Sequence, residues 1–112
     1  MPADALVVLT TCPDPDSARK LAAELVEARL AACVNVICGV QSTYRWRGNV
    51  ERDDEVLLLI KTRAGALERV GSMIQARSSY ELPELLTVCV EGGSQPYLNW
   101  LIQSVDIEEV RC

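Results

Sequence analysis

The sequence predicts an α+β domain in which two strand–helix–strand units share one sheet. Four runs of residues are apolar and rich in β-branched side chains, as buried strands are. Two longer segments repeat apolar residues at every third or fourth position, which is the pattern of one helix face. The 112 residues suffice for one compact domain and are too few for two, so we expect a single domain over 1–112.

The first unit is predicted in the N-terminal half. The run ALVVLTT at 5–11 indicates a buried strand. Asp14 and Pro15 place an acceptor at the N-cap and a proline at the first helical position, and the helix is expected to reach about Ala31. Residues 33–46 then have the composition of a second strand.

The second unit begins after a turn at 48–49. Its first strand, EVLLLIKT at 55–62, is an unbroken apolar run, which predicts burial on both faces. The rest follows in chain order: a helix over 63–77, a strand over 84–92, a short helix over 94–105, and a tail at 106–112 that either adds a strand or frays.

This order is that of the ferredoxin-like fold, in which both helices cover one face of an antiparallel sheet. The strands on either side of the turn form a long hairpin over 33–62. A straight strand over 33–47 would span about 50 Å, whereas a domain of this size is about 34 Å across. We therefore expect the hairpin to overhang its own domain or to bend at Gly39, and its unpaired edges predict self-association.

Composition and charge exclude several classes of function. Eleven basic and sixteen acidic residues give a net charge of −5, which argues against nucleic-acid binding, because that binding depends on clustered Lys and Arg. No apolar run approaches the roughly 20 residues that cross a bilayer, and the first residues do not resemble a secretory signal. We therefore expect a cytoplasmic protein without a membrane partner.

The chain has no histidine and five cysteines. Without histidine there is no Ser–His or Cys–His nucleophile pair, and the commonest transition-metal ligand is missing. No Cys-x-x-Cys pair occurs, so neither a zinc ribbon nor a thioredoxin-type motif fits. Cys12 lies in a predicted loop and is expected to be exposed, whereas Cys33 and Cys89 lie among apolar residues and are expected in the core.

The segment SSYELPELL at 78–86 supports two interpretations. In the first it is a rigid corner, because Pro83 restricts the backbone while Leu82 and Leu85 anchor the turn in the core. Tyr80 would pack its ring there and hydrogen-bond its hydroxyl.

In the second interpretation the same segment contributes to a binding pocket. Glu84 begins a strand whose neighbour presents Lys61, so that a carboxylate, a lysine and a phenol converge at a subunit boundary. A structural ion pair between Lys61 and Glu84 is the alternative. Trp46, at the hairpin tip, is either an interface anchor or a surface for stacking a ligand, and Trp100 is expected in the core.

Five motifs occur along the chain: LAACVN (30–35), YRWRG (44–48), EVLLLIKTR (55–63), YELPE (80–84) and YLNW (97–100). In order and spacing they resemble the motifs of the CutA divalent-cation tolerance family. The resemblance implies a ferredoxin-like protomer, a homotrimer built by long hairpins, and a link to copper and other divalent metals. It also implies pocket residues Lys61, Tyr80 and Glu84, with Trp46, Cys33 and Trp100 as walls.

The chain departs from the family at its metal ligands. Family members often carry His-His-Pro-Tyr where this chain has Arg-Ser-Ser-Tyr at 77–80. The proposed family cysteine aligns with Thr10, and Cys12 follows two residues later. Hard cations would take Glu81, Glu84 and water, and copper(I) would prefer Cys12 or another thiolate. Glu84 and Cys12 are the candidate metal ligands.

Three functions remain as hypotheses. The favoured one is a trimeric divalent-metal (copper) tolerance or response protein that binds copper weakly, with copper or another divalent metal as its candidate cofactor. The alternative is a ligand-sensing or interaction module of the PII type, with a metabolite in the cleft between subunits. An acylphosphatase-like enzyme would use Arg19 and Asn35, but its loop TTCPDPD is acidic and would repel phosphate. We therefore expect no catalytic residue and no enzyme activity.

Overall fold

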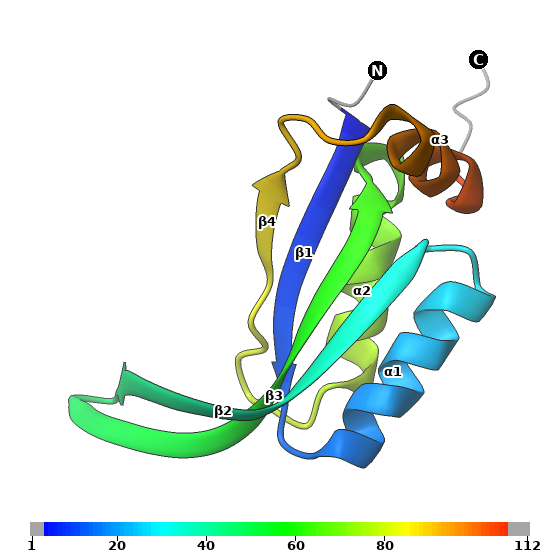
Figure 1. Cartoon of the computed structure of the whole chain (residues 1–112). Helices are drawn as coiled ribbons and strands as arrows, with labels where there is room; N and C mark the ends of the chain where they lie inside the picture. The colour runs from blue at the N-terminus through cyan, green and yellow to red at the C-terminus, as the bar shows by residue number, and fades with distance from the viewer. Residues whose placement is uncertain (1–3, 108–112) are drawn as a thin grey trace.

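The computed structural model describes residues 4–107 and has the predicted α+β architecture (Figure 1). Its strands form one antiparallel sheet in the order β2-β3-β1-β4, and helices α1 and α2 lie on the same face of it. This is the ferredoxin-like plan. The elements are β1 (Ala5–Cys12), α1 (Pro15–Glu27), β2 (Cys33–Trp46), β3 (Asn49–Arg63), a short 3-10 turn η2 (Ala64–Ala66), α2 (Leu67–Arg77), β4 (Leu86–Cys89) and α3 (Gln95–Ser104).

Helix α1 begins where the sequence predicts and ends earlier. The Asp14 side chain accepts a hydrogen bond from the Ser17 backbone N–H at 2.8 Å, and Pro15 occupies the first turn. The expected end near Ala31 is wrong, because the helix stops at Glu27. Arg29 has a φ of 60°, in the left-handed region, which turns the chain toward β2.

Strand β3 is longer than predicted, because only two residues make the hairpin turn. Arg47 and Gly48 both have positive φ, at 51° and 84°, as the tight turn between twisted antiparallel strands requires. Pairing therefore resumes at Asn49, and the polar residues 49–54 belong to the strand. The last predicted strand is shorter instead, because β4 covers only Leu86–Cys89.

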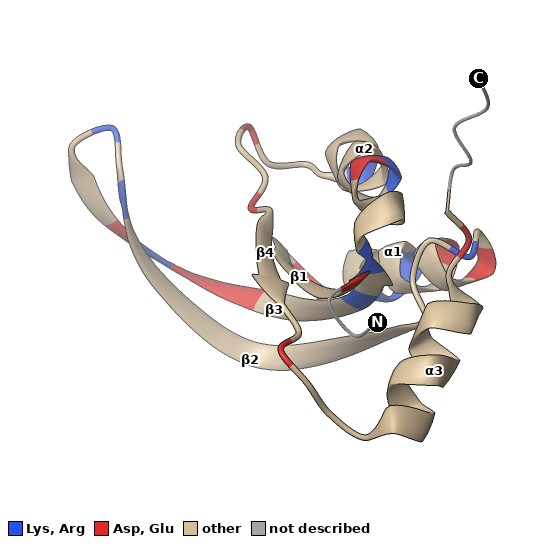
Figure 2. Cartoon of the chain, turned by 90° about the horizontal axis from the view of Figure 1, so that it is seen from above, with Lys and Arg blue, Asp and Glu red and all other residues tan. Residues whose placement is uncertain are grey.

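The hairpin of β2 and β3 both bends and overhangs its domain. The pairing of the two strands shifts between Ile37 and Val40, and Gly39 sits in this bulge with a φ of 80°. Beyond the bulge, residues 40–55 project from the body as an arm (Figures 1 and 2). The arm makes the molecule elongated, with extents of 46 × 32 × 26 Å.

The two faces of the sheet are covered differently. Toward α1 and α2, alternate residues of β3 such as Leu58 and Ile60 are fully buried. The residues between them, Leu57 and Leu59, point to the other face and are half-buried, so the predicted burial of this strand on both faces is wrong for the single chain. On the helix-covered face, Thr62 is also buried and donates its hydroxyl to the Leu30 carbonyl at 2.7 Å.

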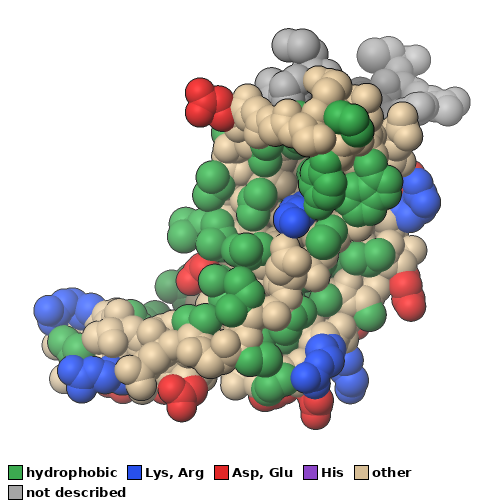
Figure 3. Space-filling view, viewed as in Figure 1, with side chains coloured by type: hydrophobic (Ala, Val, Ile, Leu, Met, Phe, Trp, Pro, Cys, Tyr) green, Lys and Arg blue, Asp and Glu red, His purple; other side chains and the backbone are tan. Residues whose placement is uncertain are grey.

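The uncovered side is called the open face here. On this face, side chains of neighbouring strands lie side by side. For example, Leu9 of β1 lies between Leu59 of β3 and Leu86 of β4. Hydrophobic side chains gather on it in the space-filling view (Figure 3), and several are strongly exposed. Its apolar members are Val7, Leu9, Ile37, Leu57, Leu59, Leu86 and Val88.

Helix α3 packs across one end of the sheet, where Leu98 and Leu101 bury against Ala5. Within residues 4–107 no helix has both the length and the apolar character needed to cross a bilayer. The prediction for the tail concerns residues that mostly lie outside the described part, which ends at Ile107.

Candidate functional site

A pocket of about 760 Å³ lies at the base of the arm. It opens between the arm and the loop that joins α2 to β4, which run side by side at the bend of the hairpin (Figure 1). The volume is within the range of small-molecule sites. It is lined by Thr11, Ser42, Thr43, Tyr44, Arg45, Trp46, Glu55, Tyr80, Glu81, Leu82, Pro83, Glu84, Leu85 and Leu86.

Tyr80 links the loop to the inner end of the arm. Its hydroxyl donates to the Glu55 carboxylate at 2.6 Å, and its backbone N–H donates to the Ser78 hydroxyl at 3.0 Å. Burial, and then the hydrogen bond to Glu55, raise the pKa of Tyr80, so the phenol stays protonated as a donor. The hydrogen bond expected of the Tyr80 hydroxyl is confirmed.

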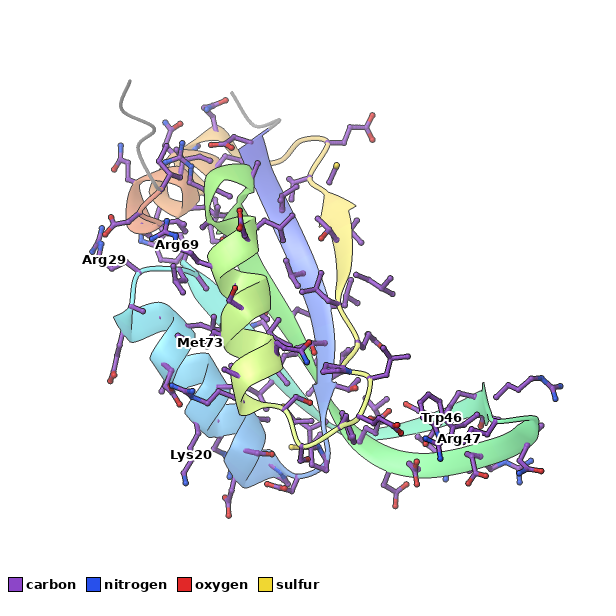
Figure 4. The ribbon with its side chains drawn as sticks, turned by 180° about the vertical axis from the view of Figure 1, so that it is seen from behind. Lys20, Arg29, Trp46, Arg47, Arg69 and Met73 are labelled. Carbon is purple, nitrogen blue, oxygen red and sulfur yellow. The ribbon has the colours of Figure 1, made fainter. Side chains whose placement is uncertain are left out.

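A second contact joins the loop to the outer end of the arm. One guanidinium nitrogen of Arg47 donates to both carboxylate oxygens of Glu81 at 2.8 Å. The Arg47 guanidinium also lies 5.3 Å from the centre of the Trp46 ring, and Figure 4 shows the two residues next to one another on the arm. Two contacts therefore hold the loop against the arm, one at each end.

The arm carries opposite charges along its length (Figure 2). Arg45 and Arg47 lie at the turn, and a run of acidic residues follows on β3. Within this run the Asp53 carboxylate accepts a hydrogen bond from the Tyr44 hydroxyl, which raises the pKa of Tyr44 to about 12. Of the residues in these contacts, Tyr44 and Glu55 of the arm line the pocket, and Asp53 does not.

The loop is not anchored by its leucines. Leu82 is 72% exposed and Leu85 is 40% exposed, so the prediction that both reach the core is wrong. The corner is fixed by polar contacts instead, since the buried Thr10 hydroxyl donates to the Glu84 carbonyl at 2.7 Å. This contact leaves the apolar side chains of the loop on the surface.

Lys61 lies at the other end of the open face, between Cys33 and Val7 in neighbouring strands. Its Nζ donates to the Tyr97 hydroxyl at 3.3 Å and lies 5.6 Å from the centre of that ring. The Tyr97 ring is 5.3 Å from Trp100. Trp100 is 45% exposed on α3, so its predicted place in the core is wrong.

The six predicted pocket residues thus fall into two groups within one chain. Trp46, Tyr80 and Glu84 line the pocket, whereas Cys33, Lys61 and Trp100 lie near α3. Strand β1 separates β3 from β4, so Lys61 and Glu84 are not on adjacent strands. Lys61 pairs with Val7 and Glu84 contacts Thr10, which are about 10 Å apart along β1.

The cysteines also differ from expectation. Cys12 is the last residue of β1 and only 8% exposed, so its predicted exposure is wrong. Burial, with smaller contributions from Asp14 and Glu55, raises the pKa of its thiol. Cys89 is exposed and Cys33 is half-buried, so neither is a core residue. Residues 4–107 contain no group of three or more Cys, Asp or Glu side chains placed to hold a metal ion.

Sequence reasoning missed the contacts that build the pocket. Glu55 and Tyr80 are 25 residues apart, and Arg47 and Glu81 are 34 apart, so no local pattern joins them. One signal was available for the Tyr44–Asp53 bond. A turn at 47–48 sets the register of the hairpin and makes these residues diagonal neighbours across the two strands.

Comparison with known proteins gives the relatives of this chain. A sequence model described as CutA1 divalent ion tolerance protein matches residues 6–104. The divalent-cation tolerance protein CutA of Thermus thermophilus is 44% identical over 95 residues, which are 85% of this chain and 92% of that protein. The chloroplastic protein CutA of Arabidopsis thaliana is 42% identical over 99 residues, which are 88% of this chain and 54% of that protein. The chain thus spans little more than half of this plant relative.

Solved structures agree with the sequence matches. The divalent cation tolerance protein of Thermus thermophilus superposes with a TM-score of 0.89 at 41% identity, over 91% of this chain and 99% of that one. CutA1 from Oryza sativa also gives 0.89, at 36% identity, over 93% of this chain and 95% of that one. Sequence and fold lead to one conclusion, that the chain belongs to the CutA1 divalent ion tolerance family.

Proposed function

We propose that the chain acts in the tolerance of, or response to, divalent metal ions as a homotrimer. Membership of the divalent ion tolerance family supports the metal role. The open face is the single observation that carries the assembly. It is apolar, and it is uncovered in one chain, with Leu86 59% and Val88 52% exposed. Apolar surface of this kind marks an interaction site.

The sheet edges support the same assembly. Strands β2 and β4 are the two edges of the sheet, and in one chain each leaves a row of backbone N–H and C=O groups unpaired on its outer side. Pairing the β2 edge of one copy with the β4 edge of the next is a head-to-tail contact, and in the proposed trimer three such contacts close into a ring. The overhanging arm gives β2 the length to reach a neighbour.

A metal would draw ligands from more than one subunit. Within residues 4–107, one chain brings no three Cys, Asp or Glu side chains together as metal ligands. Glu84 or Cys12 alone would therefore hold a metal weakly. The raised pKa of Cys12 adds a cost, because the thiol must lose its proton to bind copper. We therefore propose weak copper binding that strengthens as pH rises.

Native mass spectrometry of the reduced protein, titrated with copper, tests this function. The expected result is a trimer that takes up copper, with less uptake by Glu84→Gln and Cys12→Ser. Glu91→Gln is the matched control, because Glu91 is exposed and lies outside the pocket. A trimer that stays metal-free would refute the copper role, and a single chain would refute the assembly. These two failures are distinguishable in one spectrum.

The pocket favours a second candidate, a ligand-sensing or interaction module. The pocket is large enough for a small molecule and combines aromatic rings with carboxylates. Ligand binding to the folded state alone would raise the unfolding temperature. A thermal-shift panel of small metabolites in which nothing stabilises the trimer would refute this candidate.

The proposal includes no catalytic residue, and a cytoplasmic location stays a prediction. Relatives are named chloroplastic in Arabidopsis thaliana and periplasmic in Archaeoglobus fulgidus.

A further inference from the structure

Helix α3 is anchored to the rest of the chain by few apolar contacts. Its buried residues, Leu98 and Leu101, pack with Ala5 in a small cluster that is separate from the main core. That core lies between the sheet and helices α1 and α2, whereas α3 lies at one end of the sheet (Figure 1). Because regions with few buried apolar contacts open more readily than a core, apolar burial alone ties α3 down only weakly.

The last turn of α3 is capped by other elements of the chain. The final carbonyls of a helix have no partner within it, and basic side chains can satisfy them. Helix α3 has no basic residue in its own last turn. Instead Arg63, at the end of β3, donates to the Ile102 carbonyl at 3.2 Å, and Arg29, after α1, donates to the Gln103 carbonyl at 3.3 Å. The cap of α3 therefore exists only while the helix is docked.

Asp106, just beyond the helix, is held in the same way. Its backbone N–H donates to the Arg29 carbonyl at 2.9 Å, and its carboxylate accepts from Arg29 Nε at 3.1 Å. Its own carbonyl accepts from Arg69 of α2 at 2.8 Å. Figure 4 shows Arg29 and Arg69 beside α3. Arg29, Arg63 and Arg69 thus come from three separate elements, and they are called the arginine clasp here.

Ile107 adds a tight contact with Gly65. A Cβ atom added at Gly65 would lie 2.7 Å from Ile107 Cγ2, which is closer than two unbonded carbon atoms approach. The clasp itself is incompletely satisfied, because the buried Nε of Arg69 has no acceptor among residues 4–107. An unsatisfied buried donor costs free energy, so it limits how firmly the clasp holds.

We propose that α3 is a docking-dependent helix. It is folded only while the arginine clasp holds its last turn, and it opens together with residues 105–107 while the sheet stays folded. A helix of 10 residues is too short to be stable alone in water, so α3 melts when it leaves the clasp. Opening also takes the hydroxyl and ring of Tyr97 away from Lys61. This inference goes beyond the proposed function and does not depend on it.

The test is hydrogen exchange of the assembled, full-length protein, followed by mass spectrometry. In the wild type we expect protection factors about tenfold or more lower in α3 than in the central strands β1 and β3. Arg69→Met deletes the donor to Asp106 and keeps an unbranched side chain, so exchange in α3 should become about three- to tenfold faster. Arg19→Met is the matched control, because Arg19 pairs with Asp16 on the surface of α1 and should leave α3 unchanged.

A second variant tests the docking of α3 without a change of charge. Gly65→Ala places a methyl group against Ile107 and should also speed exchange in α3. Its control is Gly92→Ala, because an added Cβ there meets no atom within 4 Å. Either of two results would overturn the inference. One is a wild-type α3 as protected as β1 and β3, and the other is exchange in α3 that neither Arg69→Met nor Gly65→Ala accelerates.

Discussion

The two faces of the sheet are both apolar, and only one of them is covered by its own chain. Leu58 and Ile60 of β3 are fully buried beneath α1 and α2. Leu57 and Leu59, which alternate with them, remain half-buried on the open face. A single run of apolar residues thus serves two different surfaces. The difference teaches that an unbroken apolar strand need not be buried on both faces by its own chain.

The largest expected effect is on the helix-covered face. Ile60→Ala would leave a cavity between the sheet and the helices, because Ile60 is fully buried. We expect the free energy of unfolding to fall by about 2–5 kcal/mol. Urea denaturation at one fixed protein concentration measures this loss, since the stability of an assembly depends on concentration. A loss below about 1 kcal/mol would show that the site relaxes around the deletion.

The matching change on the open face should break the assembly instead. Leu59→Lys places a charge in the proposed interface, and we expect the mass in solution to fall to that of one chain while the far-ultraviolet circular dichroism is retained. Val26→Lys is the control, because Val26 is 42% exposed on α1, away from the open face. If both variants stay assembled, the open face is not the interface.

Removal of the Tyr80 hydroxyl tests the inner link of the pocket. Tyr80→Phe deletes the donor to Glu55 and keeps the ring. We expect the free energy of unfolding to fall by about 1 kcal/mol. The loss is modest because the site is half-buried, so water can hydrogen-bond to Glu55 in place of the deleted hydroxyl. An unchanged stability in denaturant titrations would mean that the ring alone fixes the loop.

The same hydroxyl should make stability fall at high pH. The folded state raises the pKa of Tyr80, so it favours the protonated phenol. Its contribution is therefore complete below the unfolded pKa of about 10, and it is lost as pH rises through the folded value. Phenolate absorbance should show Tyr80 and Tyr44 ionising late, with one late transition missing from Tyr80→Phe. If all three tyrosines of the folded protein ionised near pH 10, the hydrogen bond from Tyr80 to Glu55 would be contradicted.

The smallest effect is expected at the outer link. Arg47 and Glu81 are 69% and 66% exposed, so water and salt screen their ion pair. Arg47→Ala should change the free energy of unfolding by less than about 1 kcal/mol. A larger change that persists in high salt would show that Arg47 acts through its packing on Trp46, with Trp46→Ala as the comparison.

The fold was predictable from sequence because its signals are local. The Asp14–Pro15 helix start and the strand pattern each depend on a few neighbouring residues, and both are confirmed. The extent of β3 was not predictable from polarity. Its polar residues 49–54 belong to an arm with water on its surface, and their pairing is set by the two-residue turn.

The candidate site was predictable only in part. Tyr80, Glu84 and Trp46 do line one pocket. Lys61 does not join them, because the sheet order places β1 between its strand and β4. Trp100 and Cys89 were assigned to the core on their apolar character alone. Apolar character alone does not decide which residues a chain buries, so both were misplaced.

The most direct test of the central claim is sedimentation equilibrium of the wild-type protein over a wide range of concentrations. If the open face is an interface between chains, the mass should be three times the 12.3 kDa of one chain. It should remain so at low micromolar concentration. A mass of one chain throughout would contradict the account, because the open face would then be stable in water without a partner.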